Sequence, residues 1–97
     1  MSDRKLATVR RIASKKGITG KIEVSTRENK RFKITRPDGK IIHFGVWPYS
    51  RHGTFIDHND PDIRKAWRAR HSKIMKNGKP AYKNKDSPEF YSWNLLW

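Results

Sequence analysis

The chain has 97 residues, with 23 basic and 9 acidic side chains, which gives a net charge of +14. This length excludes a multidomain enzyme. No apolar run approaches the roughly 18 residues that cross a bilayer, and the absence of cysteine excludes a disulfide scaffold. Three classes are left: a basic binding module, a small structural protein of an assembly, and a disordered polycation.

The aromatic content argues against disorder. High charge and low hydrophobicity are typical of disordered chains, and only 34% of these residues are hydrophobic. The sequence nevertheless holds four Trp, three Tyr and four Phe. Large aromatic side chains supply most of the buried area of a small core. We therefore expect a folded domain.

The first 20 residues are predicted to form a flexible basic arm, followed by a single domain over residues 21–97. Residues 4–16 contain six basic side chains and no acid. Leu6, Val9 and Ile12 recur at helical spacing before Gly17, so a short helix formed on contact with a partner is the alternative. The segment has no apolar core of a secretory signal, and an intracellular or virion protein is expected.

Three antiparallel strands are predicted between residues 21 and 44. Apolar and polar residues alternate there with a period of two. The sequence Arg36-Pro37-Asp38-Gly39-Lys40 between the second and third strands is typical of a hairpin turn. One face of this meander is expected to be apolar and the other strongly basic. The apolar side chains are Ile22, Val24, Phe32, Ile34, Ile42 and Phe44.

Two helices are predicted in the second half, after an aromatic loop over residues 45–56. The first spans residues 61–76, with Asp60 as N-cap and Pro61 at the first helical position. Its apolar stripe is expected to consist of Ile63, Ala66, Trp67, Arg70 and Ile74. Ser87-Pro88-Glu89 begins a short aromatic helix that ends the sequence at Trp97. The predicted fold class is α+β, with the meander packed by the central helix and the C-terminal aromatic helix.

The excess of positive charge indicates a polyanionic partner, because such a charge destabilises a compact state unless it is compensated. Lysine and arginine on phosphates release condensed counterions, and interleaved aromatic residues can stack on bases. Trp47 and Tyr49 are the candidate stacking residues. The candidate phosphate-binding residues are Arg4, Lys5, Arg10, Arg11, Lys15, Lys16, Lys21, Arg31, Lys33, Lys40, Arg64 and Arg68.

No motif indicates sequence-specific reading of bases or catalysis. The helix over residues 61–76 lacks the surroundings of a helix-turn-helix, a zinc finger or a leucine zipper. The densest group of metal-ligand residue types matches no ligand spacing, and two of its members suit a helix start. The residues of this group are His52, Asp57, His58, Asp60 and Asp62. We expect no cofactor, no metal, no catalytic residue and no enzyme activity.

From residue 33 to residue 97 the sequence resembles a family of small basic proteins of unassigned function encoded by nucleocytoplasmic large DNA viruses. The elements that carry the resemblance are Pro37-Asp38-Gly39-Lys40, Phe44-Gly45, Tyr49-Ser50, Thr54 to His58, Arg70-His71 and Trp93-Asn94-Leu95-Leu96-Trp97. The last element is one residue longer than in that family. The resemblance implies a viral, virion-associated protein, found in host cytoplasm or nucleus during infection, and implies no reaction.

The leading hypothesis is a protein that binds nucleic acid without sequence preference and acts in genome packaging or condensation. Double-stranded DNA is the expected ligand. The alternative is a minor capsid or cement protein whose charge meets acidic shell partners. A metal-dependent nuclease is the third and least favoured hypothesis. No membrane partner is expected. The sequence is compatible with oligomers and with DNA or RNA as ligand.

Overall fold

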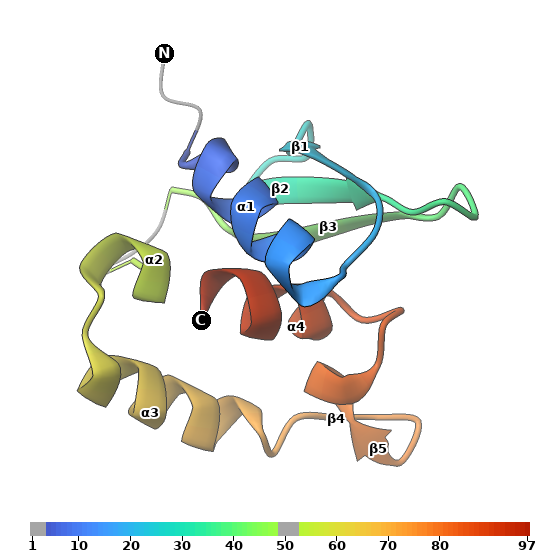
Figure 1. Ribbon diagram of the computed structural model, residues 1–97. Helices are drawn as coiled ribbons and strands as arrows, with labels where there is room; N and C mark the ends of the chain where they lie inside the picture. The colour runs from blue at the N-terminus through green and yellow to red at the C-terminus, as the bar shows by residue number, and fades with distance from the viewer. Residues whose placement is uncertain (1–3, 49–52) are drawn as a thin grey trace. The chain divides into compact units, whose positions relative to one another are not determined.

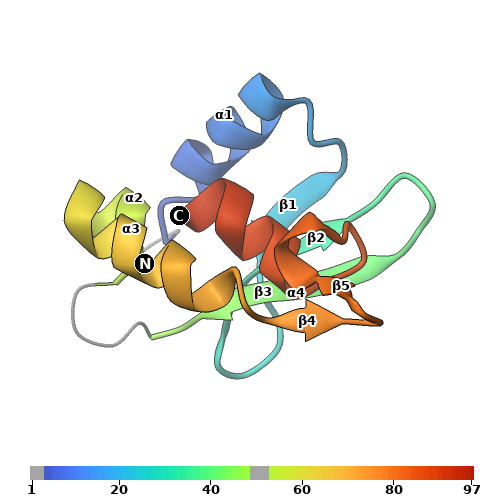
Figure 2. The same ribbon diagram turned by 90° about the horizontal axis from the view of Figure 1, so that it is seen from below.

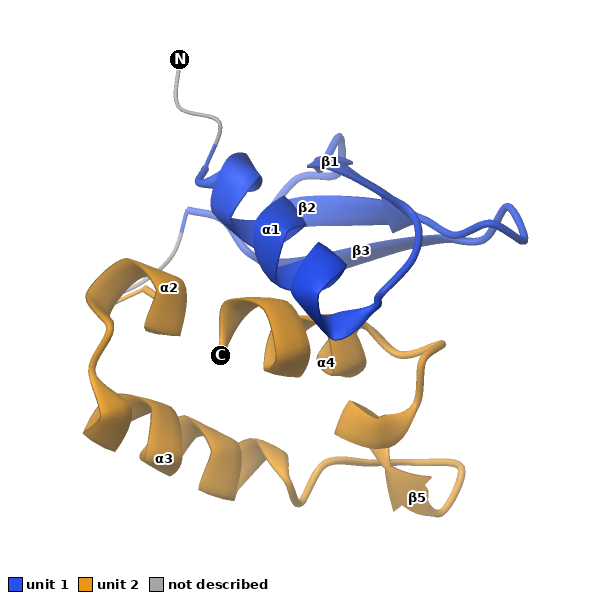
Figure 3. Cartoon of the chain, viewed as in Figure 1, with its two compact units in different colours: residues 1–48 blue, residues 49–97 orange. Residues whose placement is uncertain are grey.

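The computed structural model describes residues 4–48 and 53–97. The chain divides into two compact units, residues 1–48 and residues 49–97 (Figure 3). Unit 1 contains a helix and a three-stranded sheet, whereas unit 2 consists of helices and a small hairpin (Figure 1). An α+β fold with a three-stranded antiparallel sheet and a C-terminal aromatic helix is therefore confirmed. The boundary at residue 20 and the packing of the sheet against the second-half helices stay predictions.

The sheet of unit 1 is an antiparallel meander, as the alternating pattern predicts. Its strands are β1 (Lys21–Val24), β2 (Lys30–Thr35) and β3 (Ile41–Val46), in the order β1-β2-β3. The register aligns the predicted apolar side chains across the strands. Val24 is half-buried. The others are buried: Ile22, Phe32, Ile34, Ile42 and Phe44. The rings of the two phenylalanines lie 5.8 Å apart.

The turn between β2 and β3 forms as its sequence predicts. Arg36 donates its backbone N–H to the Lys40 carbonyl at 2.8 Å, and the Asp38 carboxylate accepts the Lys40 N–H at 3.1 Å. At the other end of the sheet, Gly20 precedes β1 with φ +132°. A Cβ there would lie 2.9 Å from the Thr35 carbonyl oxygen, so glycine is required on both steric and conformational grounds.

The segment predicted as a flexible arm forms helix α1 (Leu6–Lys16), which runs beside the sheet (Figures 1 and 2). Val9 and Ala13 on this helix are buried. Arg10 donates from Nε to the Ile22 carbonyl at 3.0 Å, which fixes the helix against β1. Helical spacing of the apolar residues was thus the informative signal, and the predicted flexibility does not apply to the helix.

Unit 2 begins with two helices that are both capped by side chains. In α2 (Phe55–His58), the Asp57 carboxylate accepts the backbone N–H of Thr54 at 2.8 Å. This short helix occupies the end of the predicted loop. The predicted start of α3 (Pro61–His71) is confirmed, because Asp60 Oδ1 accepts the Asp62 N–H at 2.9 Å.

We expect Asp60→Ala to lower the free energy of unfolding by about 1 kcal/mol, the usual cost of losing an N-cap acceptor. Chemical denaturation followed by circular dichroism measures this. Asp60→Asn keeps an acceptor oxygen at the same position and serves as the control. If both variants were equally destabilised, the loss would come from the charge and not from the cap.

The predicted helix over residues 61–76 ends five residues early, at His71. The residues predicted to stop it, Asn77 and Gly78, instead form the turn of a hairpin between β4 (Met75–Lys76) and β5 (Lys79–Pro80). Both turn residues have positive φ, 54° and 78°. This is the conformation of a type I′ turn, for which Asn-Gly is the preferred pair.

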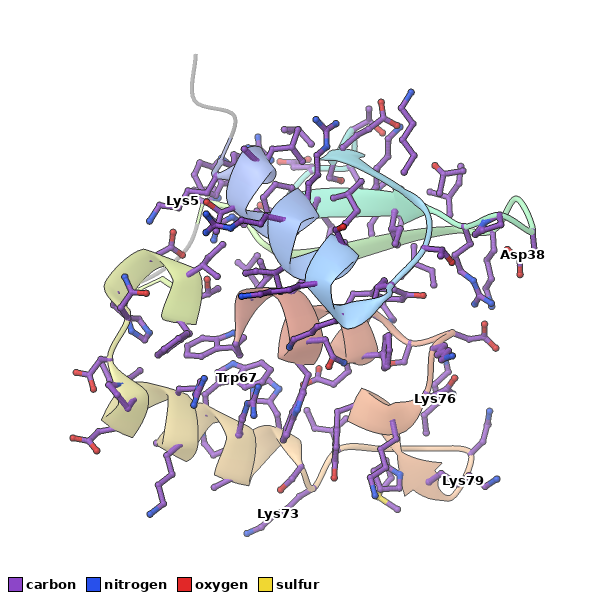
Figure 4. The ribbon with its side chains drawn as sticks, viewed as in Figure 1. Lys5, Asp38, Trp67, Lys73, Lys76 and Lys79 are labelled. Atoms are coloured by element: carbon purple, nitrogen blue, oxygen red, sulfur yellow. The ribbon has the colours of Figure 1, made fainter. Side chains whose placement is uncertain are left out.

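The aromatic residues of unit 2 pack around Trp67 (Figure 4). The Trp67 ring stacks on His71 with centroids 3.8 Å apart and on Trp97 at 4.6 Å. Trp93 lies 5.9 Å from the same ring and stacks in turn on Tyr82 at 4.0 Å. The predicted core role of Trp67 is therefore confirmed, and the two terminal tryptophans join it.

The end of the chain supplies these aromatic partners through three short turns. They are a 3₁₀ turn, η1 (Ala81–Lys83), the helix α4 (Pro88–Tyr91) and a π-helical turn, η2 (Ser92–Leu96). The predicted start at Ser87 is confirmed, because its hydroxyl accepts the Glu89 N–H at 3.2 Å. The wider turn of η2 places Leu95 and Leu96 in the core.

Candidate nucleic-acid interface

Positive charge is concentrated in unit 1. Residues 1–48 contain 13 basic and 4 acidic side chains, a net charge of +9, whereas residues 49–97 contain 10 basic and 5 acidic side chains, a net charge of +5. The units are of nearly equal length. A polyanion would therefore meet the stronger field at unit 1.

Helix α1 presents the densest group of exposed cations in unit 1. It contains no acidic residue, and Arg10, Arg11 and Lys15 are exposed. At 100° per residue these three lie within an arc of about 140°, on the side away from buried Val9 and Ala13. We define the α1 surface as the predicted residues that are exposed on or next to this helix: Lys5, Arg10, Arg11, Lys15, Lys16 and Lys21.

Arg31, one of the predicted phosphate-binding residues, is buried and so does not present its charge to solvent. Its side chain is 1% exposed, and its Nη2 donates to the Arg4 carbonyl at 2.9 Å. Arg4 in turn donates from Nη1 to the Lys30 carbonyl at 3.1 Å. The guanidinium carbons of Arg4 and Arg31 lie 4.7 and 5.3 Å from the Trp47 ring centroid. These arginines and Trp47 hold the start of α1 to the sheet.

The two predicted arginines of α3 are also engaged within the fold. The guanidinium carbon of Arg64 lies 4.5 Å from the Phe55 ring centroid, and that of Arg68 lies 4.9 Å from the Trp93 ring centroid. Burial lowers the pKa of Arg68, and the positive charge of Arg64 lowers it further. Arg70, predicted on the apolar stripe, is exposed instead.

The buried side of α3 is therefore shifted from the predicted stripe. Its half-buried and buried residues are Ile63, Arg64, Trp67, Arg68 and His71. His71 Nδ1 contacts Glu89 Oε1, which ties the end of the helix to α4. Ala66 and Ile74, which were expected on the stripe, are exposed.

A second group of cations lies on the sheet. The register places Lys33 of β2 beside His43 of β3, on the face opposite to the buried apolar side chains. His43 Nδ1 is 2.7 Å from the Ser25 hydroxyl oxygen. Burial lowers the pKa of His43, and the charges of Arg27, Lys33 and Lys30 lower it further, in that order. Lys33 was among the predicted residues, but His43 was not.

The other exposed basic residues belong to neither group. Lys40 is exposed at the end of the β2–β3 turn. The exposed cations on α3, on the β4–β5 hairpin and in the connection between them were not predicted as site residues, and no pattern in the sequence distinguishes them from solvated charges. They are Lys65, Arg70, Lys73, Lys76 and Lys79, of which three are labelled in Figure 4.

Two residues singled out in the sequence, Tyr49 and His52, lie outside the described residues. Within residues 4–48 and 53–97, no three His, Cys, Asp or Glu side chains come together as metal ligands would. Asp57 and Asp60 cap helices instead. None of the described helices combines the length and the apolar character needed to cross a membrane.

Residues 20–71 match a family of unknown function (DUF5754). The matched segment is more than half of the 97 residues. The chain belongs to this family. The DUF5754 segment includes the whole sheet of unit 1 and the helices α2 and α3, and it leaves out α1 and the C-terminal aromatic residues. No curated protein and no solved structure matches the chain.

The DUF5754 match carries no activity, ligand or source. The resemblance to small basic viral proteins therefore stays a prediction, as do the virion location and the nucleic-acid partner. Of the two groups of cations in unit 1, the sheet group around His43 lies inside the DUF5754 segment and the α1 surface lies almost entirely before it.

Proposed function

We propose that this protein binds nucleic acid through phosphate contacts of the α1 surface, without sequence preference. The observation that carries the proposal is that α1 is fixed on the sheet by buried Val9 and Ala13, while its solvent side carries only positive charge. A fixed row of cations binds phosphates with less loss of side-chain and backbone entropy than a mobile arm does.

The spacing of the exposed cations suits a phosphate backbone. Arg11 and Lys15 are separated by four residues, about 6 Å along the helix axis. Lys15 and Lys16 occupy the last turn, where the helix dipole favours positive charge, so holding them there costs little. Contacts of this kind position a protein on a duplex and read no bases. Genome packaging or condensation in a viral particle or replication compartment is the role that we propose for such binding.

The experiment that tests the proposal compares two double variants of equal net charge, +12. We expect Arg11→Gln/Lys15→Gln to bind a 20-base-pair duplex about 60-fold more weakly at 0.1 M salt, because each phosphate contact contributes a factor of about 8 at that concentration. Fluorescence anisotropy measures the affinity. The matched control, Lys65→Gln/Lys73→Gln, removes two exposed cations from unit 2 and is expected to bind like the unaltered protein.

Two outcomes would overturn the proposal. Equal weakening of both double variants would mean that net charge and not the α1 surface determines binding. The absence of duplex binding in the unaltered protein, together with tight binding to a purified acidic capsid subunit, would establish the minor capsid or cement role instead.

A further inference from the structure

On the outer face of the sheet, His43 lies beside Lys33, and the charges of Arg27 in the β1–β2 turn and of Lys30 at the start of β2 also act on it. Antiparallel pairing aligns Glu23, Lys33 and His43 in one row across β1, β2 and β3. Ser25 follows β1, and its hydroxyl meets His43 Nδ1. We define the His43 cluster as Ser25, Arg27, Lys30, Lys33 and His43.

The three cations of the cluster form no ion pair in the described part of the chain. The side chains of Arg27, Lys30 and Lys33 form no ion pair or hydrogen bond with another described residue. Glu23 faces Lys33 in the register and lies 3.9 Å from Lys21 Nζ, and Glu28 is in the β1–β2 turn. Positive charge therefore exceeds negative charge at the cluster.

The hydrogen bonds at Ser25 determine which atom of His43 can meet a ligand. The Ser25 hydroxyl accepts the Arg27 backbone N–H at 3.0 Å, so its position is fixed by the turn. It engages Nδ1 of the imidazole, and this is the one hydrogen bond of the His43 side chain among the described residues. Nε2 is thereby left for an external partner, and it carries a proton in the tautomer that accepts from the serine.

We propose that the His43 cluster binds a phosphate group of the nucleic-acid backbone, through the His43 imidazole and the Lys33 ammonium, in the field of Arg27 and Lys30. A phosphate offers several acceptor oxygens and the negative charge that the cluster lacks. The assignment rests on the function proposed above and adds a contact on the sheet, inside the DUF5754 segment.

The cluster makes this contact sensitive to pH. In the free protein the pKa of His43 lies below its ordinary value of 6.5, because of burial and the three cations. A bound phosphate favours the imidazolium and raises the pKa. Affinity therefore increases as the pH falls through the pKa of the complex and levels off below the pKa of the free protein. The charged side chains around His43 are Arg27, Lys30 and Lys33, with Glu23 in the same row of the sheet.

The experiment follows the imidazole signals of the full chain by NMR between pH 8 and pH 5.5, alone, with inorganic phosphate and with a 20-base-pair duplex. The His43 signal is assigned by its loss in His43→Gln, a variant whose amide can retain the bond to Ser25. We expect the duplex to raise the pKa of His43 by about 1 unit, which corresponds to about tenfold tighter binding at the acidic end.

Three single variants complete the test, each checked for an unchanged circular dichroism spectrum. We expect His43→Gln to lose the tenfold gain at low pH and Lys33→Gln to bind more weakly at every pH. Lys40→Gln removes an exposed cation of the neighbouring turn, and we expect it to keep the pH dependence.

The outcomes separate this proposal from the function on which it rests. If the duplex binds and the pKa of His43 does not move, the His43 cluster is not a phosphate site, while the α1 proposal stands. A shift with inorganic phosphate but not with the duplex would overturn the assignment to the nucleic-acid backbone. If the protein binds no duplex at all, the proposed function itself is wrong.

Discussion

Replacing Trp67 by alanine is expected to lower the free energy of unfolding by about 3–5 kcal/mol, the usual range for truncating a large aromatic residue in a core. The ring is 9% exposed and lies between His71 and Trp97, with Trp93 at its edge. Its removal would leave these partners around a cavity. Chemical denaturation followed by far-ultraviolet circular dichroism measures the loss without relying on tryptophan fluorescence.

The control for this variant is Arg70→Ala on the same helix. Arg70 is exposed, so we expect a change within about 0.5 kcal/mol. If Arg70→Ala cost as much as Trp67→Ala, the buried side of α3 would be the one predicted from the sequence and not the one that the structure shows.

Salt is expected to weaken duplex binding by about three orders of magnitude between 50 and 200 mM. If all six cations of the α1 surface contact phosphates, the logarithm of affinity falls with the logarithm of salt at a slope of about −5 on duplex DNA. Fluorescence anisotropy at several salt concentrations gives this slope. A single-stranded ligand should give a shallower one, since each contact then contributes about −0.7.

The salt slope also distinguishes the two hypotheses about the partner. For Arg11→Gln/Lys15→Gln we expect a slope smaller in magnitude by about 2, because two contacts are lost. A slope near zero for the unaltered protein would contradict phosphate binding and favour a partner recognised by apolar or specific polar contacts.

The strands of the three-stranded sheet and the turn between β2 and β3 were predictable because their signals are local. Alternation over residues 21–44 and the Pro37-Asp38-Gly39 sequence each act within a few residues, and the register follows from the turn. The N-caps Asp60 and Ser87 are local in the same sense.

Hydrophobic periodicity did not predict which side of α3 is buried. That method counts arginine as polar, whereas Arg64 and Arg68 pack their guanidinium groups on the rings of Phe55 and Trp93. The partner of Arg68 lies 25 residues further along the chain, and the partner of Arg64 lies nine residues before it, outside the helix. Such a pairing is a property of tertiary packing and leaves no mark on the helix sequence itself.

The candidate site was predictable in charge but not in geometry. A count of lysines and arginines identified the residues of the α1 surface, yet it also included Arg31, which the fold buries. The Ser25–His43 contact joins residues 18 positions apart. It becomes visible only when the register of three strands is known, and for this reason the His43 cluster was missed.

The position of α1 has a practical consequence for anyone who produces part of this protein. A fragment that begins at residue 20, where the family match starts, would lack Val9 and Ala13, which the fold buries, and the Arg4 bonds to β2. The sheet would then lose its contacts with α1, and Trp47 would lose its contact with the Arg4 guanidinium. A recombinant fragment of unit 1 that folds stably should therefore start at or before Arg4, upstream of residue 20, where the family match begins.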